Sequence, residues 1–123
     1  MMLYIRAVTI NILFLWSIGE ENFWVDDGCK GTGTSHDGSF HDQSYQAGVR
    51  CCSNDGSTCT TPEDFSCKDD EMLSYGEAVS KCSDNGRLCS KDELLSGICC
   101  GTGGGCDSYE VWTSTSESGN GKY

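Results

Sequence analysis

The stretch Leu73–Cys100, LSYGEAVSKCSDNGRLCSKDELLSGICC, predicts the two convincing helices of this chain. Ser74 is followed three residues later by Glu77, and Ser90 is followed in the same way by Glu93. Each pair is typical of a capping box, in which the serine hydroxyl accepts from the third helical N–H and the glutamate accepts from the serine N–H. We therefore expect one helix to begin after each serine.

The residues that follow support both helices and indicate where they end. After Ser74, apolar side chains recur at i, i+3, i+4 and i+7, at Tyr75, Ala78, Val79 and Cys82. Asn85-Gly86 is expected to end the first helix and Gly97 the second, because glycine tolerates the left-handed conformation common after a helix. The other segments contain few apolar residues, so we expect them to wrap around this helix pair.

Cysteine content indicates how the wrapping is held together. Ten of the 123 residues are cysteines, about 8%, near the level that marks a disulfide scaffold in a short secreted chain. The chain contains no Cys-x-x-Cys motif, and adjacent cysteine side chains diverge, which disfavours zinc binding. We expect five disulfides formed in an oxidising compartment, with the two members of each Cys-Cys pair bound to different partners. The cysteines are Cys29, Cys51, Cys52, Cys59, Cys67, Cys82, Cys89, Cys99, Cys100 and Cys106.

The segment 1–19 is predicted to be a signal peptide. One positive charge, Arg6, precedes the mostly apolar run Ala7–Gly19, which ends in the small-x-small sequence Ser17-Ile18-Gly19. The alternatives are an N-terminal strand or core helix, or a retained signal anchor. We expect residues 20–114 to form a cysteine-rich domain and residues 115–123 a polar tail, and we expect the protein to be secreted.

The predicted fold class is α+β: a small disulfide-rich domain with two short helices and a few short antiparallel strands. Residues 23–25 are expected to form an edge strand, 46–52 a short strand and 108–114 the last strand, whereas 30–46 reads as a loop. The expected core is thin, and small cores rarely supply more than ~3–5 kcal/mol, so the disulfides should decide whether the chain folds. Its members are Phe23, Trp24, Val25, Val49, Tyr75, Ala78, Val79, Leu88, Leu94, Leu95, Ile98, Val111 and Trp112.

Net charge limits the partners. The formal charge is −11 for the whole chain and becomes −12 when Arg6 leaves with the signal peptide. Binding of nucleic acid depends on Lys and Arg, so this balance excludes it as a natural partner and disfavours anionic membrane surfaces. It fits basic partners or divalent cations, although a solvated acidic surface is the favoured interpretation.

We find no set of residues that predicts catalysis. His36-Asp37 and His41-Asp42 could each orient a general base, but they lie in a polar loop without a Gly-x-Ser-x-Gly nucleophile motif. The glycine run 101–105 lacks the Gly-Lys-Ser/Thr ending of a phosphate-binding loop. We expect no enzymatic activity and no cofactor.

Two features are candidates for ligand contact. The acidic run Asp69, Asp70 and Glu71 offers carboxylates of the kind that bind Ca²⁺, but it lacks the EF-hand loop pattern, so a solvated acidic turn is favoured over a metal site. Trp112 lies in the last expected strand, where a core position is favoured and stacking on a sugar ring is the alternative.

Two resemblances add to these expectations. Tyr75-Gly76-Glu77-Ala78, with Cys82, Gly86-Arg87-Leu88 and Glu93-Leu94, resembles the first helix and following segment of C-type-lectin-like and link modules, over a short part of the chain. The resemblance implies a C-type-lectin-like arrangement in which Cys82 reaches the C-terminal region near Cys106.

The second resemblance is to an uncharacterised cysteine-rich domain of secreted and surface proteins of algae and other marine protists, and it extends from Val49 to Ser114. It brings no established activity and no catalytic residues. The residues that carry it are Val49-Arg50-Cys51-Cys52-Ser53, Tyr75–Cys82, Gly86-Arg87-Leu88-Cys89-Ser90, Glu93-Leu94, Cys99-Cys100-Gly101-Thr102-Gly103, Asp107 and Val111-Trp112-Thr113-Ser114.

These observations favour a non-catalytic extracellular module: a matrix, cell-surface or fibril component that binds a glycan or an extracellular protein, or assembles with itself. The alternative is a secreted disulfide-rich effector, such as a toxin, a defence protein or a protease inhibitor.

Overall fold

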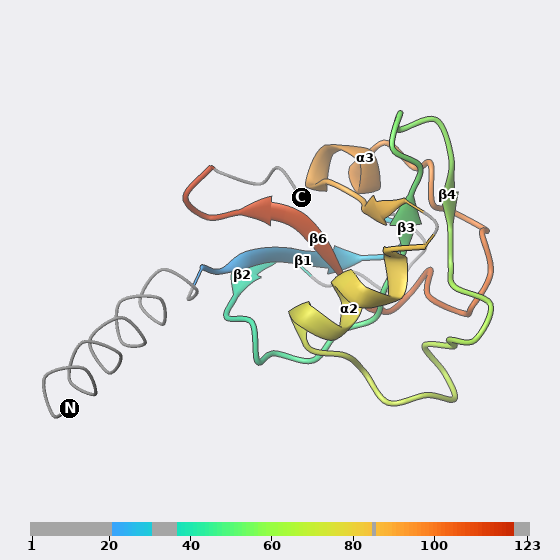
Figure 1. Cartoon of the computed structure of the whole chain (residues 1–123), viewed down its shortest axis with the longest axis horizontal. Helices are drawn as coiled ribbons and strands as arrows, with labels where there is room; N and C mark the ends of the chain where they lie inside the picture. Colours follow the sequence, from blue (N-terminus) through green and yellow to red (C-terminus); the bar gives the residue numbers. More distant parts are fainter. Residues whose placement is uncertain (1–20, 31–36, 85, 120–123) are drawn as a thin grey trace, which may run out of the picture.

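The computed structural model of the chain describes residues 21–30, 37–84 and 86–119. The proposed signal peptide, His36 and the last four residues lie outside the described residues. Two short helices, two small antiparallel sheets and five disulfides form one α+β domain, which confirms the predicted fold class (Figure 1). The lectin-like arrangement stays a prediction. No helix in the described ranges is long and apolar enough to cross a membrane.

The first sheet has β1 (Phe23–Asp27) at its centre, between β2 (Ser39–His41) and β6 (Glu110–Ser116). Both neighbours run antiparallel to β1, and the register with β6 shifts between Phe23 and Val25. The expectation that residues 23–25 form an edge strand was therefore wrong. β2, with the sequence Ser-Phe-His, lies within the segment 30–46 that was expected to be a loop. β6 continues past the expected end of the last strand at Ser114.

The two helices contact opposite faces of this sheet. Successive side chains of a strand point to opposite faces, and Phe23 stacks on Tyr75, the first residue of α2 (Tyr75–Cys82), with ring centroids 3.8 Å apart. On the other face, the ammonium group of Lys91, the first residue of α3 (Lys91–Leu95), lies 3.9 Å from the centre of the Trp24 ring. Figure 1 shows α2 and α3 on either side of the β1–β6 pair.

Both predicted capping boxes are present, with reciprocal hydrogen bonds between Ser74 and Glu77 and between Ser90 and Glu93. Gly86, which follows α2, has φ +129°, and a Cβ there would clash with the carbonyl oxygen of Cys52. Glycine is therefore required where the chain turns from α2 towards the second sheet.

The second sheet is built from very short strands. β3 (Cys51–Cys52) lies between β4 (Cys59–Thr60) and β5 (Arg87–Leu88), and both pairings are antiparallel. Such short ladders offer few hydrogen bonds, so disulfides from Cys51, Cys52 and Cys59 hold these strands to the rest of the domain.

All ten cysteines are paired. Members of each adjacent pair go to different partners, as predicted, but Cys82 binds Cys51 and not a cysteine near Cys106, so that expectation was wrong. Cys82 ends α2 beside β3, whereas Cys106 closes the glycine loop on the segment before α2. The disulfides are Cys29–Cys100, Cys51–Cys82, Cys52–Cys89, Cys59–Cys99 and Cys67–Cys106.

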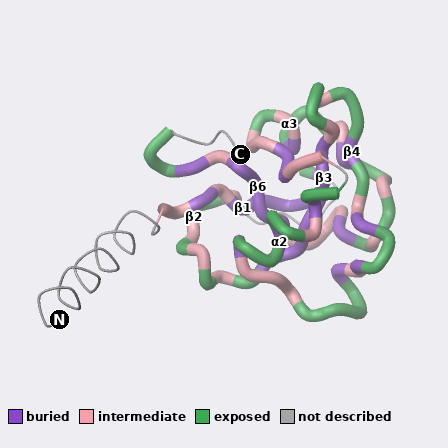
Figure 2. The backbone as a smooth tube through the Cα atoms, viewed as in Figure 1, coloured by how far each residue is buried: buried purple, intermediate pink, exposed green. Residues whose placement is uncertain are grey.

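The core runs along β1, β6 and β3, and the outer loops are exposed (Figure 2). Most expected core residues are buried, but Val79 and Leu95 are 37% and 42% exposed, because each lies on the outer side of its short helix. Ala47 and Phe65 are buried core residues that the sequence did not reveal. Trp24 and Ile98 are half-buried.

Arg50 is a second unexpected member of the interior, with 1% of its surface exposed. Its guanidinium donates to the carbonyl oxygens of Gly28, Cys99 and Gly103 and forms an ion pair with Asp107 at 2.8 Å. Although burial raises the pKa of Asp107, hydrogen bonds from Arg50 and from the Gly101 N–H lower this pKa overall. One buried cation thus holds together the end of β1 and the glycine loop.

Candidate functional site

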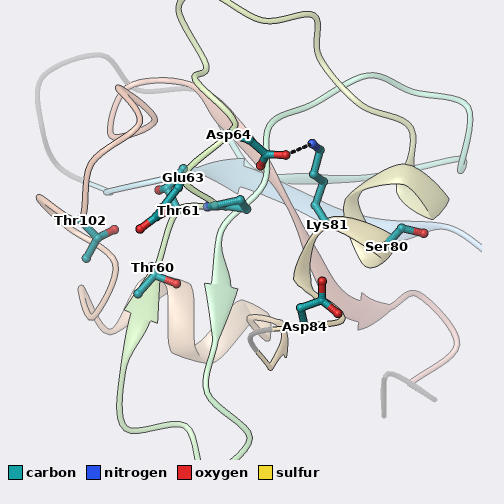
Figure 3. Close-up of a pocket in the computed structure, with 9 residues that line it drawn as sticks. Thr60, Thr61, Glu63, Asp64, Ser80, Lys81, Asp84 and Thr102 are labelled. Atoms are coloured by element: carbon teal, nitrogen blue, oxygen red, sulfur yellow. Dashed lines mark hydrogen bonds and ion pairs between the residues drawn. The ribbon is translucent and has the colours of Figure 1, made fainter.

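A polar pocket of about 780 Å³ lies between the segment after β4, the end of α2 and the glycine loop (Figure 3). Hydroxyl and carboxylate groups dominate its lining, and one amine contributes. The lining residues are Thr60, Thr61, Pro62, Glu63, Asp64, Ser80, Lys81, Asp84 and Thr102.

Disulfides fix all three walls of the pocket. Thr60 follows Cys59, which is bound to Cys99 on the glycine-loop side, and Lys81 precedes Cys82, which is bound to β3. Hydrogen bonds complete the frame, since the Thr102 hydroxyl donates to the Cys99 carbonyl at 2.7 Å. Walls tethered in this way should change little when a ligand binds.

Packing also joins the β4 wall to the glycine loop. The Thr61 hydroxyl donates to the carbonyl of Gly103 at 3.1 Å. Gly104 has φ +71°, and a Cβ there would clash with the Thr61 methyl group. The glycine run 101–105 therefore lets this wall approach Thr61 closely.

Lys81 spans the pocket wall and contacts Asp64. The ammonium nitrogen lies 2.9 Å from Asp64 Oδ2, as the dashed line in Figure 3 marks. This hydrogen bond and the charge of Lys81 lower the pKa of Asp64. Both side chains face solvent, so the pair orients two groups at the rim and adds little stability.

Glu63 and Asp84 are exposed acids, and neither carboxylate has a hydrogen-bond or ion-pair partner among the residues that the structure describes. Carboxylates are acceptors for hydroxyl, ammonium and guanidinium donors. With Lys81 already paired to Asp64, the pocket offers two unpaired negative charges and four hydroxyls, which belong to Thr60, Thr61, Ser80 and Thr102. This arrangement suits a ligand rich in hydrogen-bond donors and disfavours an anionic one.

Trp112, the candidate for stacking on a sugar ring, does not lie at a surface. Its side chain is 0% exposed, its indole N–H donates to the carbonyl of Leu73 at 2.8 Å, and Tyr75 packs edge-on against it at 5.4 Å. The favoured prediction of a core position is confirmed, and the alternative of ligand contact was wrong, because Trp112 fills the space between the first sheet and the start of α2.

The acidic run 69–71 forms an exposed turn. Asp70 accepts from the backbone N–H of Ser66 at 2.7 Å, and Asp69 accepts from the Ser66 hydroxyl at 3.3 Å. Glu71 takes no part in these contacts. The two aspartates therefore close a local turn around Ser66 and do not converge with Glu71 on a shared point.

Metal-ligating atoms gather at one place in the described ranges 21–30, 37–84 and 86–119. The sulfur atoms of Cys52, Cys59, Cys89 and Cys99 all lie within 4.8 Å of one another in the interior. All four are taken up in two disulfides, Cys52–Cys89 and Cys59–Cys99.

Of the two histidines, His41 lies in β2, stacks on Tyr45 with ring centroids 3.7 Å apart and shares a hydrogen bond of 2.9 Å with the Ser39 hydroxyl. His36 lies outside the described residues. Tyr45 in turn donates to Glu110 at 2.6 Å, and this hydrogen bond, with burial, raises the pKa of the phenol to about 12. These contacts connect His41 in β2 to Glu110 in β6 through Tyr45, which gives His41 a structural role.

The polar pocket was not predicted from the sequence. The signal available was the run of hydroxyls and carboxylates in residues 60–64, directly after Cys59. The opposite walls, at Ser80, Asp84 and Thr102, are brought to it by disulfide pairing that the sequence does not specify.

Comparisons of the chain with protein-family models, with curated proteins and with solved structures returned no match. The resemblance to the cysteine-rich domain of marine protist proteins therefore stays a prediction, and function is inferred from the molecule itself.

Proposed function

We propose that this protein is a non-catalytic extracellular recognition module that binds a neutral or amine-bearing glycan in the polar pocket. The observation that supports the proposal best is a cavity lined by hydroxyls and unpaired carboxylates whose walls are joined by disulfides. Five disulfides in a small domain are typical of proteins that work outside the cell. A matrix or cell-surface location is part of this proposal.

The chemistry of the pocket selects the class of glycan. Vicinal sugar hydroxyls donate to carboxylates such as Glu63 and Asp84. The hydroxyls of Thr61 and Thr102 already donate to carbonyls, so they can accept from the same sugar. Sulfated or uronic glycans would meet two unpaired carboxylates within a chain of charge −11, and like charges repel. An amino sugar would gain charge-assisted hydrogen bonds instead.

A glycan array probed with the disulfide-bonded domain tests this proposal. We expect binding to neutral or amino glycans and none to sulfated ones. In the double variant Glu63→Gln/Asp84→Asn, the affinity should fall at least tenfold, because each substitution removes an acceptor with negative charge. The matched control is Glu71→Gln/Asp92→Asn, which changes the net charge equally at exposed acids outside the pocket and should leave the affinity unchanged.

Three outcomes would contradict the proposal: no glycan bound, a preference for sulfated glycans, or an equal loss of affinity in both double variants. Selective capture of a protein ligand by the same pocket would favour the effector alternative.

Export is tested separately by expression of the whole chain in a secreting eukaryotic cell. We expect the protein in the medium with a new N-terminus at Glu20 and ten cysteines resistant to alkylation. Retention in the cell with free thiols would contradict the extracellular proposal, whatever the pocket binds.

A further inference from the structure

The four gathered sulfur atoms form two disulfides in contact with each other. Cys89 Sγ lies 3.5 Å from Cys99 Sγ and 3.6 Å from Cys59 Sγ, while its own disulfide partner is Cys52. These distances are close to van der Waals contact, so a thiolate released from one disulfide would already touch the other. The group within 4.8 Å contains no sulfur of the other three disulfides.

We propose that this cluster is a thiol–disulfide exchange site, entered by a small external thiol at Cys59, at which the pairing 52–89/59–99 converts to 52–59/89–99 without net oxidation or reduction. The co-reactant is a monothiol of the glutathione class. The inference goes beyond glycan recognition and does not depend on it.

Burial selects Cys59 as the point of entry. Cys59 is 6% exposed, whereas Cys52, Cys89 and Cys99 are 0–1% exposed. It also adjoins Thr60, which lines the polar pocket. A thiolate RS⁻ that attacks Cys59 Sγ forms the mixed disulfide RS–S(Cys59) and expels the thiolate of Cys99, because exchange proceeds through attack of a thiolate on a disulfide sulfur.

Two further steps complete the conversion. The Cys99 thiolate attacks Cys89 Sγ, 3.5 Å away, which forms the 89–99 bond and expels the thiolate of Cys52. That thiolate attacks Cys59 Sγ, forms the 52–59 bond and releases RS⁻. Cys52 and Cys59 are direct cross-strand partners in the β3–β4 ladder, so the last bond joins residues that are already opposite each other. Electrons balance, and the external thiol is regenerated.

The exposed disulfide provides an internal comparison. Cys100 is exposed, and a thiol reaches it more easily than Cys59, but the gathered sulfur group does not include the Cys29–Cys100 disulfide. Attack there gives a mixed disulfide whose released partner has no second disulfide to attack, so the original bond re-forms.

The test compares two single substitutions in adjacent cysteines of the full chain. Cys52→Ala leaves a thiol on Cys89, in contact with the 59–99 disulfide, and we expect exchange to carry a large share of the free thiol to Cys59. Cys51→Ala is the matched control, because the thiol it leaves on Cys82 is not part of the gathered sulfurs and should stay there. The position of the thiol is read by alkylation at neutral pH, acid quenching and peptide mass spectrometry.

The expected result is alkylated Cys59 in Cys52→Ala at ten times or more the share of any displaced thiol in Cys51→Ala. Alkylation confined to Cys89 in Cys52→Ala would overturn the proposal, as would equal scrambling in both variants. Should a variant fail to fold, the unmodified chain in a glutathione buffer gives the same decision: new 52–59 and 89–99 linkages, with the other three disulfides intact, support the exchange site. Unchanged linkages, or loss of all five, refute it.

Discussion

The two sheets of this domain are stabilised by different means. The β2–β1–β6 sheet contains no cysteine within its strands; its long strand β6, aromatic contacts and hydrogen bonds hold it. The β4–β3–β5 sheet has very short strands that contain three cysteines, Cys51, Cys52 and Cys59. Where the backbone ladder is long enough to bury aromatic side chains, sulfur is not needed. Where it is short, cross-links replace the ladder.

The largest expected effect comes from the cysteine-free sheet. Trp112→Ala should lower the free energy of unfolding by about 4 kcal/mol, through lost burial and the cavity left behind. Its buried indole also donates to the Leu73 carbonyl, which would keep only the hydrogen bond from the Ala47 N–H. Chemical denaturation measures the change. A loss below about 1 kcal/mol, smaller than most core truncations, would mean that the disulfides alone maintain the fold.

Removal of one disulfide tests the stability of the β4–β3–β5 sheet. Cys51→Ala/Cys82→Ala should cost about 3 kcal/mol, since a cross-link closing a loop of this length restricts the unfolded chain by roughly that amount. Hydrogen exchange should rise in β3, β4 and α2 and stay slow in β1 and β6. Faster hydrogen exchange throughout the domain would contradict the claim that the two sheets are stabilised by different means.

Arg50 joins the two regions, so its removal should affect both. Arg50→Met should cost about 2 kcal/mol, because hydrogen bonds to a buried charge typically contribute ~1.5–3 kcal/mol. The carbonyls of Cys99 and Gly103 keep other donors, whereas Gly28 loses the Arg50 donor and Asp107 loses its cation. We expect faster hydrogen exchange at Cys29 and across the glycine loop. The control is Arg87→Met. The Arg87 side chain is 28% exposed and pairs with Glu93, so the effect should be confined to β5 and the start of α3.

The smallest expected effect depends on pH. Two hydrogen bonds from Arg87, with the Ser90 N–H, lower the pKa of Glu93 from 4.5 to about 2. A lowered folded-state pKa stabilises the fold above the unfolded value, so this contribution, about 1 kcal/mol after solvent screening, is complete above pH ~5 and lost as the pH falls towards 2.

Thermal unfolding from pH 6 to below pH 2 checks this expectation. Glu93→Gln should flatten the fall in melting temperature over that window and leave the values below pH 2 unchanged. Asp55, whose pKa is also lowered to about 2 by the hydroxyls of Ser53 and Ser57 and the backbone N–H of Ser57, should maintain part of the slope in the variant.

Local features were predictable and long-range ones were not. Ser74 and Ser90 predicted both helices, because capping depends on residues three apart. The last strand was predicted over 108–114, and Val111 and Trp112 were expected in the core, where both lie. β2 was not predicted because its residues are mostly polar. Without β2, β1 was expected at the edge of the sheet, whereas it lies at the centre.

The polar pocket could not be anticipated for a related reason. Its walls meet through the Cys59–Cys99 and Cys51–Cys82 disulfides, and ten cysteines allow far too many pairings for spacing to choose among them. Arg50 lies in the segment 46–52 that was expected to be a short strand, yet its partners, Gly28, Gly103 and Asp107, lie far from it along the chain in both directions.

Complete pairing of the ten cysteines within one chain has a consequence for how copies of this domain would associate. The folded molecule offers no thiol for a covalent link to its neighbours. A fibre or sheet assembled from it would be joined by reversible surface contacts alone, and would disperse in detergent without any reducing agent.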